Sequence, residues 1–141
     1  MKALFLDIDG VLNGIGFLKG QVMSGGRDRI DRETVGRINQ IVEATDAQIV
    51  LTSSWRLENA LSSIDTFLRG YGLEPHISEK TSLLDHRGAE ISAWLDRKDV
   101  AQYAILDDDA VLGHDHHFVR TRAYDGVKDQ DVTTAIKILR G

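Results

Sequence analysis

The chain has 141 residues, 42% of them apolar and 28% charged, with 13 glycines, one proline and a net charge of −5. This length fits a single domain over residues 1–141, and the composition is typical of an ordered globular protein. The lack of cysteine excludes disulfides, thiolate metal sites and a cysteine nucleophile, and the acidic charge argues against a general duplex-binding protein.

Neither a secretory signal nor a membrane span is expected. The first residues form a strand-like run interrupted by Asp7 and Asp9, which differs from the apolar centre of a signal peptide. No later run approaches the roughly 18 consecutive apolar residues that a membrane span needs. We therefore expect a cytoplasmic protein, monomeric by default, with no membrane partner.

The first predicted element is a buried strand over residues 3–6, a short apolar run that ends in an acid. The glycine-rich stretch that follows, residues 10–26, predicts a small hairpin or flap rather than a helix. Apolar residues at helical spacing then predict a helix over residues 31–44, with Asp31 as its N-cap.

The rest of the chain alternates between the two kinds of element. In chain order the apolar spacing predicts a strand at 47–51, a helix at 57–68, an extended piece at 75–78, a helix near 91–95, strands at 103–106 and 118–121, and a helix at 132–139. This alternation predicts an α/β fold, a Rossmann-like three-layer sandwich. Its mostly parallel central sheet would be covered by helices on both faces and carry a small flap in place of a large cap.

Oxygen-bearing side chains follow three of the predicted strands. They are Asp7 and Asp9 after the first, Thr52 and Ser53 after the second, and Asp107 and Asp108 after the strand at 103–106. Ligands of an open parallel sheet bind beyond the carboxyl ends of its strands. A turn or helix cap explains any one of these groups, but paired acids at two strand ends would repel each other without a cation between them. The pattern indicates a site for a hard divalent cation.

Three segments in this order, residues 6–12, 51–53 and 105–108, resemble motifs of the haloacid dehalogenase (HAD) superfamily. Residues 52–56, 87–95 and 107–109 are further similar to compact phosphatase domains found alone or attached to RNA-repair and polynucleotide kinase modules. The resemblance covers almost the whole chain. It implies a magnesium-dependent phosphatase that passes through an aspartyl-phosphate.

The resemblance implies roles for the acidic residues. Asp7 would be the nucleophile, and Asp9 the general acid that later serves as the general base. Mg²⁺ would be held by Asp7, the main-chain carbonyl of Asp9, and Asp107 with Asp108, and would neutralise charge between carboxylate and phosphate. Asp9 follows Asp7 by two residues, so both side chains would point the same way if the strand continued.

Hydroxyl and cationic side chains complete the predicted site. Thr52 or Ser53 would donate a hydrogen bond to a phosphate oxygen, with Thr52 preferred. Arg56 would either fork onto two phosphate oxygens or be a solvated residue of the next helix. The cation of the third family motif is Lys80 or Arg87, and we favour Arg87 because a glycine and a helix follow it directly.

Other polar and aromatic features are expected to matter less. The run His114–His117 lacks the fixed geometry of a metal site, because adjacent side chains of an extended segment point in opposite directions. Trp55 and Trp94 are predicted to be core residues rather than platforms for bases. Three basic residues of the flap region either attract an anionic substrate or are simply solvated: Lys19, Arg27 and Arg29.

The short intervals between the motifs leave no room for a large lid. An open site suits a bulky phosphorylated substrate, and the terminal phosphate of a nucleic acid is our leading prediction. A small-molecule or nucleotide phosphomonoesterase is the alternative. A receiver-like signalling module that is phosphorylated on aspartate is the alternative outside the enzymes, but receivers take their phosphorylated aspartate from a later strand.

Overall fold

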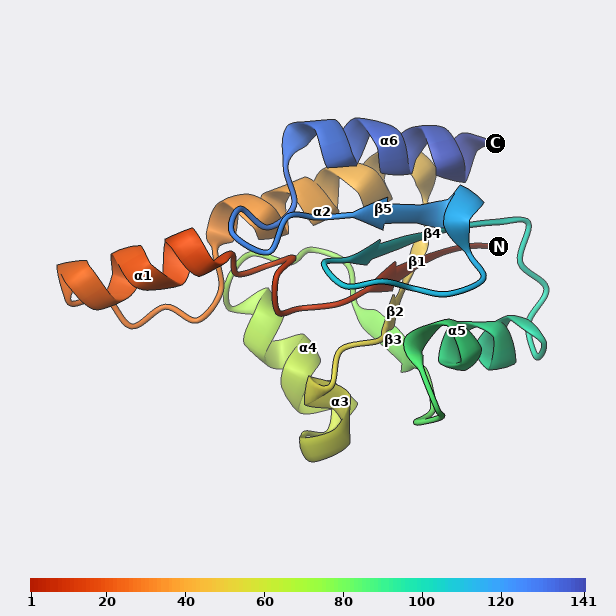
Figure 1. Ribbon diagram of the computed structural model, residues 1–141, viewed down its shortest axis with the longest axis horizontal. Helices are drawn as coiled ribbons and strands as arrows, with labels where there is room; N and C mark the ends of the chain where they lie inside the picture. Colours follow the sequence, from red (N-terminus) through yellow and green to blue (C-terminus); the bar gives the residue numbers. More distant parts are fainter.

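The computed structural model describes residues 1–141 as a five-stranded parallel sheet with helices on both faces (Figure 1). The strands are β1 (Lys2–Leu6), β2 (Gln48–Leu51), β3 (Ile77–Lys80), β4 (Gln102–Asp107) and β5 (Phe118–Arg120), in the order β3-β2-β1-β4-β5. The helices are α1 (Ile15–Ser24), α2 (Arg32–Thr45), α3 (Trp55–Glu58), α4 (Leu61–Arg69), α5 (Arg87–Leu95), the short 3₁₀ helix η1 (Asp115–His117) and α6 (Asp129–Arg140). The predicted α/β three-layer fold is confirmed.

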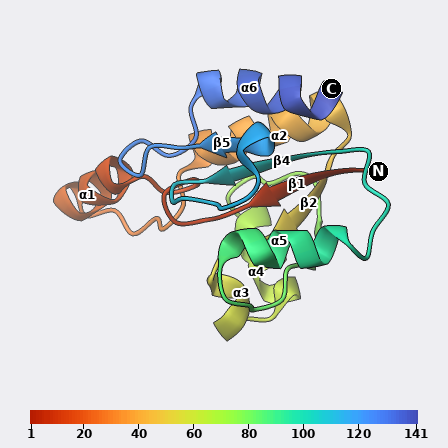
Figure 2. The same cartoon turned by 45° about the vertical axis from the view of Figure 1, so that its right-hand side comes forward.

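Alternation along β1 divides the core into two clusters. Leu4 and Leu6 belong to a large cluster of 23 buried residues that includes side chains of α2, α4 and α6. Ala3 and Phe5 face the other way and join Trp94 of α5 in a cluster of seven. Figure 2 shows α5 on the face of the sheet opposite α2 and α6. Because successive strand residues point to opposite faces, one apolar strand supports helices on both sides.

The other strands of the sheet lie on both sides of β1. From β1 the chain builds β2 and β3 on one side, then crosses back to place β4 and β5 on the other. Leu6 pairs with Leu51 of β2 and with Leu106 of β4, so these three strands end at the same level. This edge is the switch point at which open α/β sheets bind ligands.

The predicted flap is wrong in detail, because residues 15–24 form helix α1 and not a hairpin. Ile15, Leu18 and Val22 are spaced by three and four residues, a helical interval that the many glycines obscured. Gly25, with φ of 78°, ends the helix in the left-handed conformation. No residue of α1 is buried, and the helix projects from one end of the sheet (Figure 1).

The single helix predicted at 57–68 is also wrong, because the chain breaks it into α3 and α4. Asn59 is extended, with φ of −131° and ψ of 143°, and its Nδ2 donates to the carbonyl of Trp55 at 3.1 Å. An asparagine side chain that bonds nearby backbone competes with helical hydrogen bonding. The break turns α3 away from α4 beside the carboxyl end of β2.

The remaining predicted elements match the structure to within a few residues. Asp31 caps α2 as expected, accepting from the amide of Glu33 at 3.0 Å.

His114 is buried and its ring contacts the hydroxyl groups of Ser92 and Tyr103 at 2.9 and 2.8 Å. No helix of the fold has the length and apolar character needed to cross a membrane.

Candidate active site

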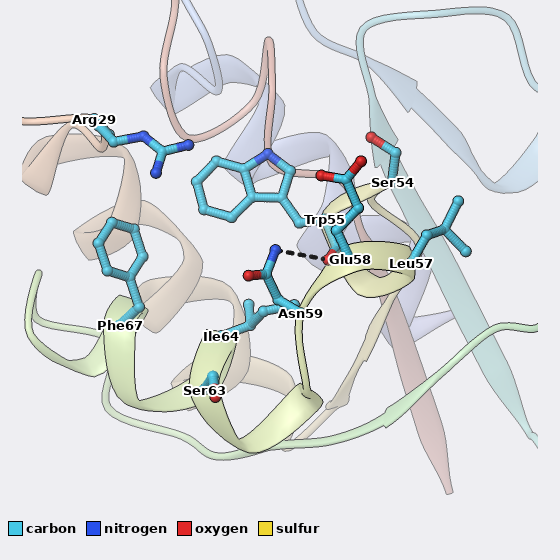
Figure 3. A pocket seen from close by; sticks show the side chains of 9 residues that line it. All are labelled: Arg29, Ser54, Trp55, Leu57, Glu58, Asn59, Ser63, Ile64 and Phe67. Carbon is cyan, nitrogen blue, oxygen red and sulfur yellow. Dashed lines mark hydrogen bonds between the residues drawn. The ribbon is translucent and has the colours of Figure 1, made fainter.

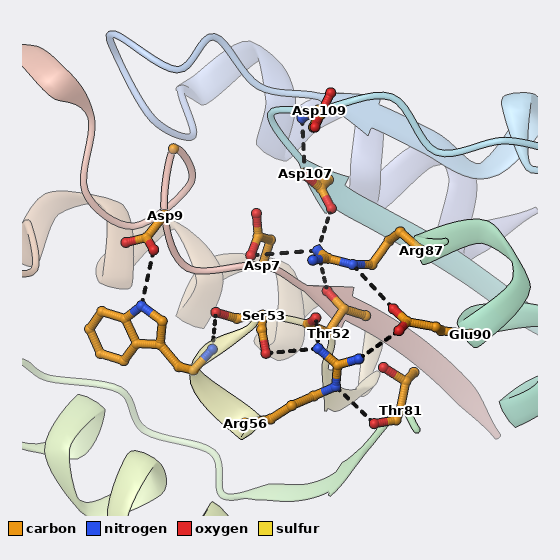
Figure 4. Close-up of polar contacts among 12 residues, drawn as sticks. Asp7, Asp9, Thr52, Ser53, Arg56, Thr81, Arg87, Glu90, Asp107 and Asp109 are labelled. Carbon is orange, nitrogen blue, oxygen red and sulfur yellow. Dashed lines mark hydrogen bonds and ion pairs between the residues drawn. The ribbon is translucent and has the colours of Figure 1, made fainter. Parts of the chain in front are cut away.

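Three carboxylates meet where β1 and β4 end. One oxygen each of Asp7, Asp107 and Asp108 lies within 4.8 Å of the other two. The sheet register brings them together, since the amide of Asp7 donates to the carbonyl of Leu106 at 3.1 Å. We call these three residues the acidic centre; Figure 4 shows Asp7 and Asp107 of this group. The predicted grouping of Asp7 with Asp107 and Asp108 is present in the fold.

The acidic centre is electrostatically costly. Asp7 is 8% exposed and Asp107 only 2%. Burial, together with repulsion from Asp107, raises the pKa of Asp7 to about 8, although Arg87 acts in the opposite direction. Burial also raises the pKa of Asp107. A carboxylate pair of this kind is stabilised by a nearby cation, and hard oxygen donors of this type suit Mg²⁺.

Arg87, the first residue of α5, supplies a fixed positive charge to this centre. Its NH1 donates to Asp107 Oδ2 at 2.7 Å and lies 3.6 Å from Asp7 Oδ1. The same nitrogen is 3.5 Å from the hydroxyl of Thr52. Lys80, the other candidate for the third motif, is exposed at the end of β3 and lines a different cavity with Arg97 and Lys98. The fold therefore brings Arg87 and not Lys80 to the carboxylates.

The Arg56 guanidinium has no free N–H group to offer to a phosphate, and it is not exposed to solvent. Both interpretations from the sequence, a fork onto phosphate oxygens and a solvated residue, are therefore wrong. The guanidinium is buried, and each of its five N–H groups has a partner (Figure 4). The partners are the carbonyls of Thr52, Ser53, Thr81 and Ser82 and the carboxylate of Glu90. A guanidinium with no donor to spare ties loops together and cannot also hold phosphate.

Glu90 joins the two arginines and was not indicated by the sequence. Its Oε2 lies 2.9 Å from Arg56 and accepts from the amide of Leu84 at 3.0 Å, while its Oε1 lies 3.5 Å from Nε of Arg87. Glu90 follows Arg87 by three residues on α5, a spacing that lets both side chains share one face. The same spacing is common in pairs of charged residues on exposed helices, and only the burial of Glu90 distinguishes the Arg87–Glu90 pair from them.

The two predicted hydroxyl groups lie under the site. Thr52 and Ser53 are fully buried at the end of β2. The Ser53 hydroxyl accepts from the amide of Trp55 at 3.2 Å and so supports the start of α3. Ser54, one residue further, is exposed and lines the active-site cavity. Hydrogen bonding of Thr52 or Ser53 to phosphate stays a prediction.

Asp9 lies beside the acidic centre but not within it. The strand ends at Leu6, so the assumed continuation does not set the direction of Asp9. Instead Trp55 Nε1 donates to Asp9 Oδ2 at 3.0 Å, and Asn13 Nδ2 donates to Asp9 Oδ1 at 3.0 Å. Asp7 and Asp9 line the same cavity. The proposed acid is thus held by a tryptophan that the sequence assigned to the core.

Gly10 fits between these acidic residues because it lacks a side chain. Its φ is 81°, and a Cβ at this position would lie 2.8 Å from Cβ of Asp108. The turn that carries Asp9 therefore packs directly on the end of β4.

The cavity above these residues has a volume of about 490 Å³ and is lined mainly by polar groups. It contains clustered carboxylates, a fixed arginine and a separate exposed carboxylate. Such an arrangement can bind a cation, hold an anion against it, and offer both a nucleophile and a proton donor.

A family model described as the HAD domain in Swiss Army Knife RNA repair proteins matches residues 3–132. No curated protein and no solved structure matches the chain.

Proposed function

The chain belongs to this family of HAD domains, a superfamily of hydrolases, and we propose that it is a magnesium-dependent phosphatase working through an aspartyl-phosphate. The observation that carries the proposal is the acidic centre, with three carboxylate oxygens within 4.8 Å and Arg87 beside two of them. Neither a turn nor a helix cap requires such a group of buried charges.

The donor set fits a magnesium ion. Side-chain oxygens of Asp7, Asp107 and Asp108 would hold it, and the main-chain carbonyl of Asp9 is a further predicted ligand. The pKa of Asp7, which burial and then repulsion from Asp107 raise, agrees with this assignment, because a bound cation would stabilise the carboxylate form. When bound, the ion would supply positive charge for the approach of an anionic phosphate to an anionic nucleophile.

The reaction proposed for these residues has two displacements at phosphorus. In the first, an Asp7 oxygen bonds to phosphorus, the bond to the leaving oxygen breaks, and Asp9 gives that oxygen its proton. In the second, Asp9 takes a proton from water, the water oxygen bonds to phosphorus, and the bond to Asp7 breaks. Inorganic phosphate, the Asp7 carboxylate and protonated Asp9 remain. Arg87 would donate to the phosphate oxygens and stabilise charge in both transition states.

The proposed substrate is a phosphate at an accessible end, with the terminal phosphate of a nucleic acid as the leading candidate. Between α3 and Arg87 the chain contains only α4 and β3, and α1 is the one helix between β1 and α2. These intervals hold no separate cap domain that could enclose the site. The family description, which names RNA repair proteins, further supports a polynucleotide.

Phosphate release from an aryl phosphate tests the mechanism. We expect magnesium-dependent release that a chelator abolishes and that Asp7→Asn lowers at least about 10³-fold, because the amide is a far weaker nucleophile. Asp99→Asn, an exposed residue in the loop before β4, is the matched control and should behave as the wild type.

Unchanged activity of Asp7→Asn would contradict the covalent mechanism. A stable phospho-adduct formed from acetyl phosphate, without turnover, would instead favour the receiver-like module. A panel of oligonucleotides with 3′ or 5′ phosphates, free nucleotides and sugar phosphates then identifies the substrate class.

A further inference from the structure

A second cavity adjoins the active site on the side of α3 and α4. It has a volume of about 440 Å³, within the range of roughly 300–1,000 Å³ usual for small-molecule sites. Its wall includes Arg29, Ser54, Trp55, Asn59, Ser63 and Phe67 (Figure 3). We call these six residues the Trp55 pocket. The break between α3 and α4 creates it, since Asn59 at the break is part of the wall.

The walls of the pocket combine aromatic faces with polar groups. The Trp55 and Phe67 rings lie 5.8 Å apart at 47°, and the Arg29 guanidinium lies 4.8 Å from the centre of the Trp55 ring. Polar side chains of Ser54, Asn59 and Ser63 are also part of the wall. Aromatic rings flanked by an arginine and by hydrogen-bonding side chains are the elements with which proteins bind unpaired bases.

The pocket is continuous with the active site. Ser54 lines both cavities. Trp55 connects them through its indole, whose carbon face belongs to the pocket and whose Nε1 donates to Asp9 Oδ2 at 3.0 Å. Asp9 is the proposed acid for the leaving oxygen, and the Trp55 pocket is the cavity next to it. A leaving group that extends from Asp9 past Trp55 would therefore enter the pocket.

We propose that the Trp55 pocket receives the base of the terminal nucleotide whose phosphate reaches Asp7. This inference rests on the proposed phosphatase function and adds to it the part of the substrate that is recognised. The polar wall favours a base over the ring of a phosphotyrosine, another aromatic group that a phosphate ester can carry. A base carries donors and acceptors on its edge for Asn59 and Ser63, whereas a phenyl ring carries none on its edge.

The half-buried state of Trp55 agrees with this assignment. Trp94 is 1% exposed and is a core residue as predicted, whereas Trp55 packs partly on the core and partly faces the pocket. Arg29 is exposed, so its position over an aromatic ring is not needed to bury either residue.

Rates on matched substrates test the proposal. The first substrate is an RNA oligonucleotide phosphorylated on its terminal nucleotide, the second is the same oligonucleotide without the terminal base, and both are prepared with 3′ and with 5′ phosphates. Glycerol phosphate is the reference to which each rate is compared. Stacking and hydrogen bonding of one base predict a kcat/KM at least about five-fold higher with the base than without it at the preferred end.

Two variants examine the walls of the pocket separately. Phe67→Leu and Arg29→Gln should each lower the preference for the base toward unity, and Arg97→Gln, an exposed arginine beside another cavity, should keep it. Equal rates on the two oligonucleotides in the wild type would overturn the proposal. A better rate on a phosphotyrosine peptide than on either oligonucleotide would also overturn it.

Binding without turnover separates this inference from the proposed function. In Asp7→Asn, binding of the phosphorylated oligonucleotide should quench the fluorescence of Trp55, and removal of the terminal base should weaken binding at least about five-fold. Trp55→Phe leaves the buried Trp94 as the fluorescent residue and should abolish the quenching. Base-dependent binding together with no hydrolysis by the wild type would contradict the proposed phosphatase but uphold the pocket. Hydrolysis without base dependence would do the reverse.

Discussion

The acidic centre and the Trp55 pocket are neighbours built in opposite ways. The acidic centre stands on the ends of β1 and β4, where Asp7 and Asp107 are buried and Arg87 lies beside both of them. The Trp55 pocket is formed by α3, by the start of α4, by Asn59 between these helices and by the loop that carries Arg29. Most of its wall is exposed. The proposed chemistry thus lies at the ends of paired strands, and the proposed recognition lies on exposed segments beside them, which tolerate change better.

Their supports differ in the same way. Behind the acidic centre, Arg56, Glu90 and Arg87 form a continuous line of charge from the buried loops to Asp107. In the pocket, the exposed Arg29 guanidinium lies over the Trp55 ring, 4.8 Å from its centre, and forms no ion pair. Substitutions in the first region should therefore cost stability or turnover, and substitutions in the second should change selectivity.

The largest effect on stability is expected from Arg56→Met. It removes Arg56 from the buried Glu90 and takes the guanidinium donors from four carbonyls, which should lower the free energy of unfolding by about 3–5 kcal/mol. Urea unfolding measures this change. Arg29→Gln should cost about 1 kcal/mol or less. Similar losses for both variants would remove the energetic difference between the two regions.

Arg87→Lys should reduce turnover more than stability. Lysine keeps the charge but cannot contact Asp107 and a phosphate oxygen with separate N–H groups. We expect kcat to fall about 10²–10³-fold on every phosphorylated substrate, the size of effect seen when one donor to a transition state is lost. Lys80→Gln is the control and should leave kcat unchanged, since Lys80 lies at another cavity. A change confined to KM would assign Arg87 to binding.

Magnesium should stabilise the protein more as the pH rises. In the free protein the pKa of Asp7 is about 8, above its ordinary 3.8, so its contribution to stability is complete below pH 3.8 and is lost as the pH rises through 8. Magnesium takes the place of the proton at the acidic centre. The rise in Tm on adding the ion should be larger near pH 8.5 than near pH 6, with a stabilisation of about 2.7 kcal/mol at 100 times Kd.

Asp7→Asn should remove most of this pH dependence, because the amide does not titrate. Equal shifts in Tm at both pH values in the wild type would show that magnesium does not compete with the proton on Asp7.

Trp55→Phe should give the smallest effect and link the two regions. Phenylalanine keeps an aromatic face in the pocket but removes the hydrogen bond to Asp9, a loss of about 1 kcal/mol that corresponds to about five-fold in kcat. The preference for a terminal base should persist. Loss of that preference with unchanged kcat would show that the indole serves recognition alone.

The difference between the regions also explains what the sequence could predict. Asp7 and Asp107 were predictable because each follows a buried strand, and the parallel register places them side by side. Arg87 was favoured over Lys80 because a glycine and a helix follow it, and the start of α5 brings it to both acids. Regular elements carry these residues, so spacing along the chain translates into position.

Residues whose role depends on how deeply the side chain is buried were not predictable from the sequence. Arg56 was expected to bind phosphate or water, yet the turn after β2 points it into the protein, where five acceptors hold it. Trp55 was assigned to the core because apolar spacing does not reveal the break at Asn59. Local sequence also misjudged α1, where glycine content outweighed a helical interval. These outcomes depend on tertiary packing, which overrides local preference.

The stereochemical course at phosphorus tests the aspartyl-phosphate most directly. A thiophosphate monoester made chiral at phosphorus with two oxygen isotopes is hydrolysed by the wild type in water that carries the third isotope, and the configuration of the thiophosphate product is determined. Two in-line displacements, first by Asp7 and then by water, predict retention of configuration. Inversion would show that water attacks phosphorus directly and would contradict the role given to Asp7.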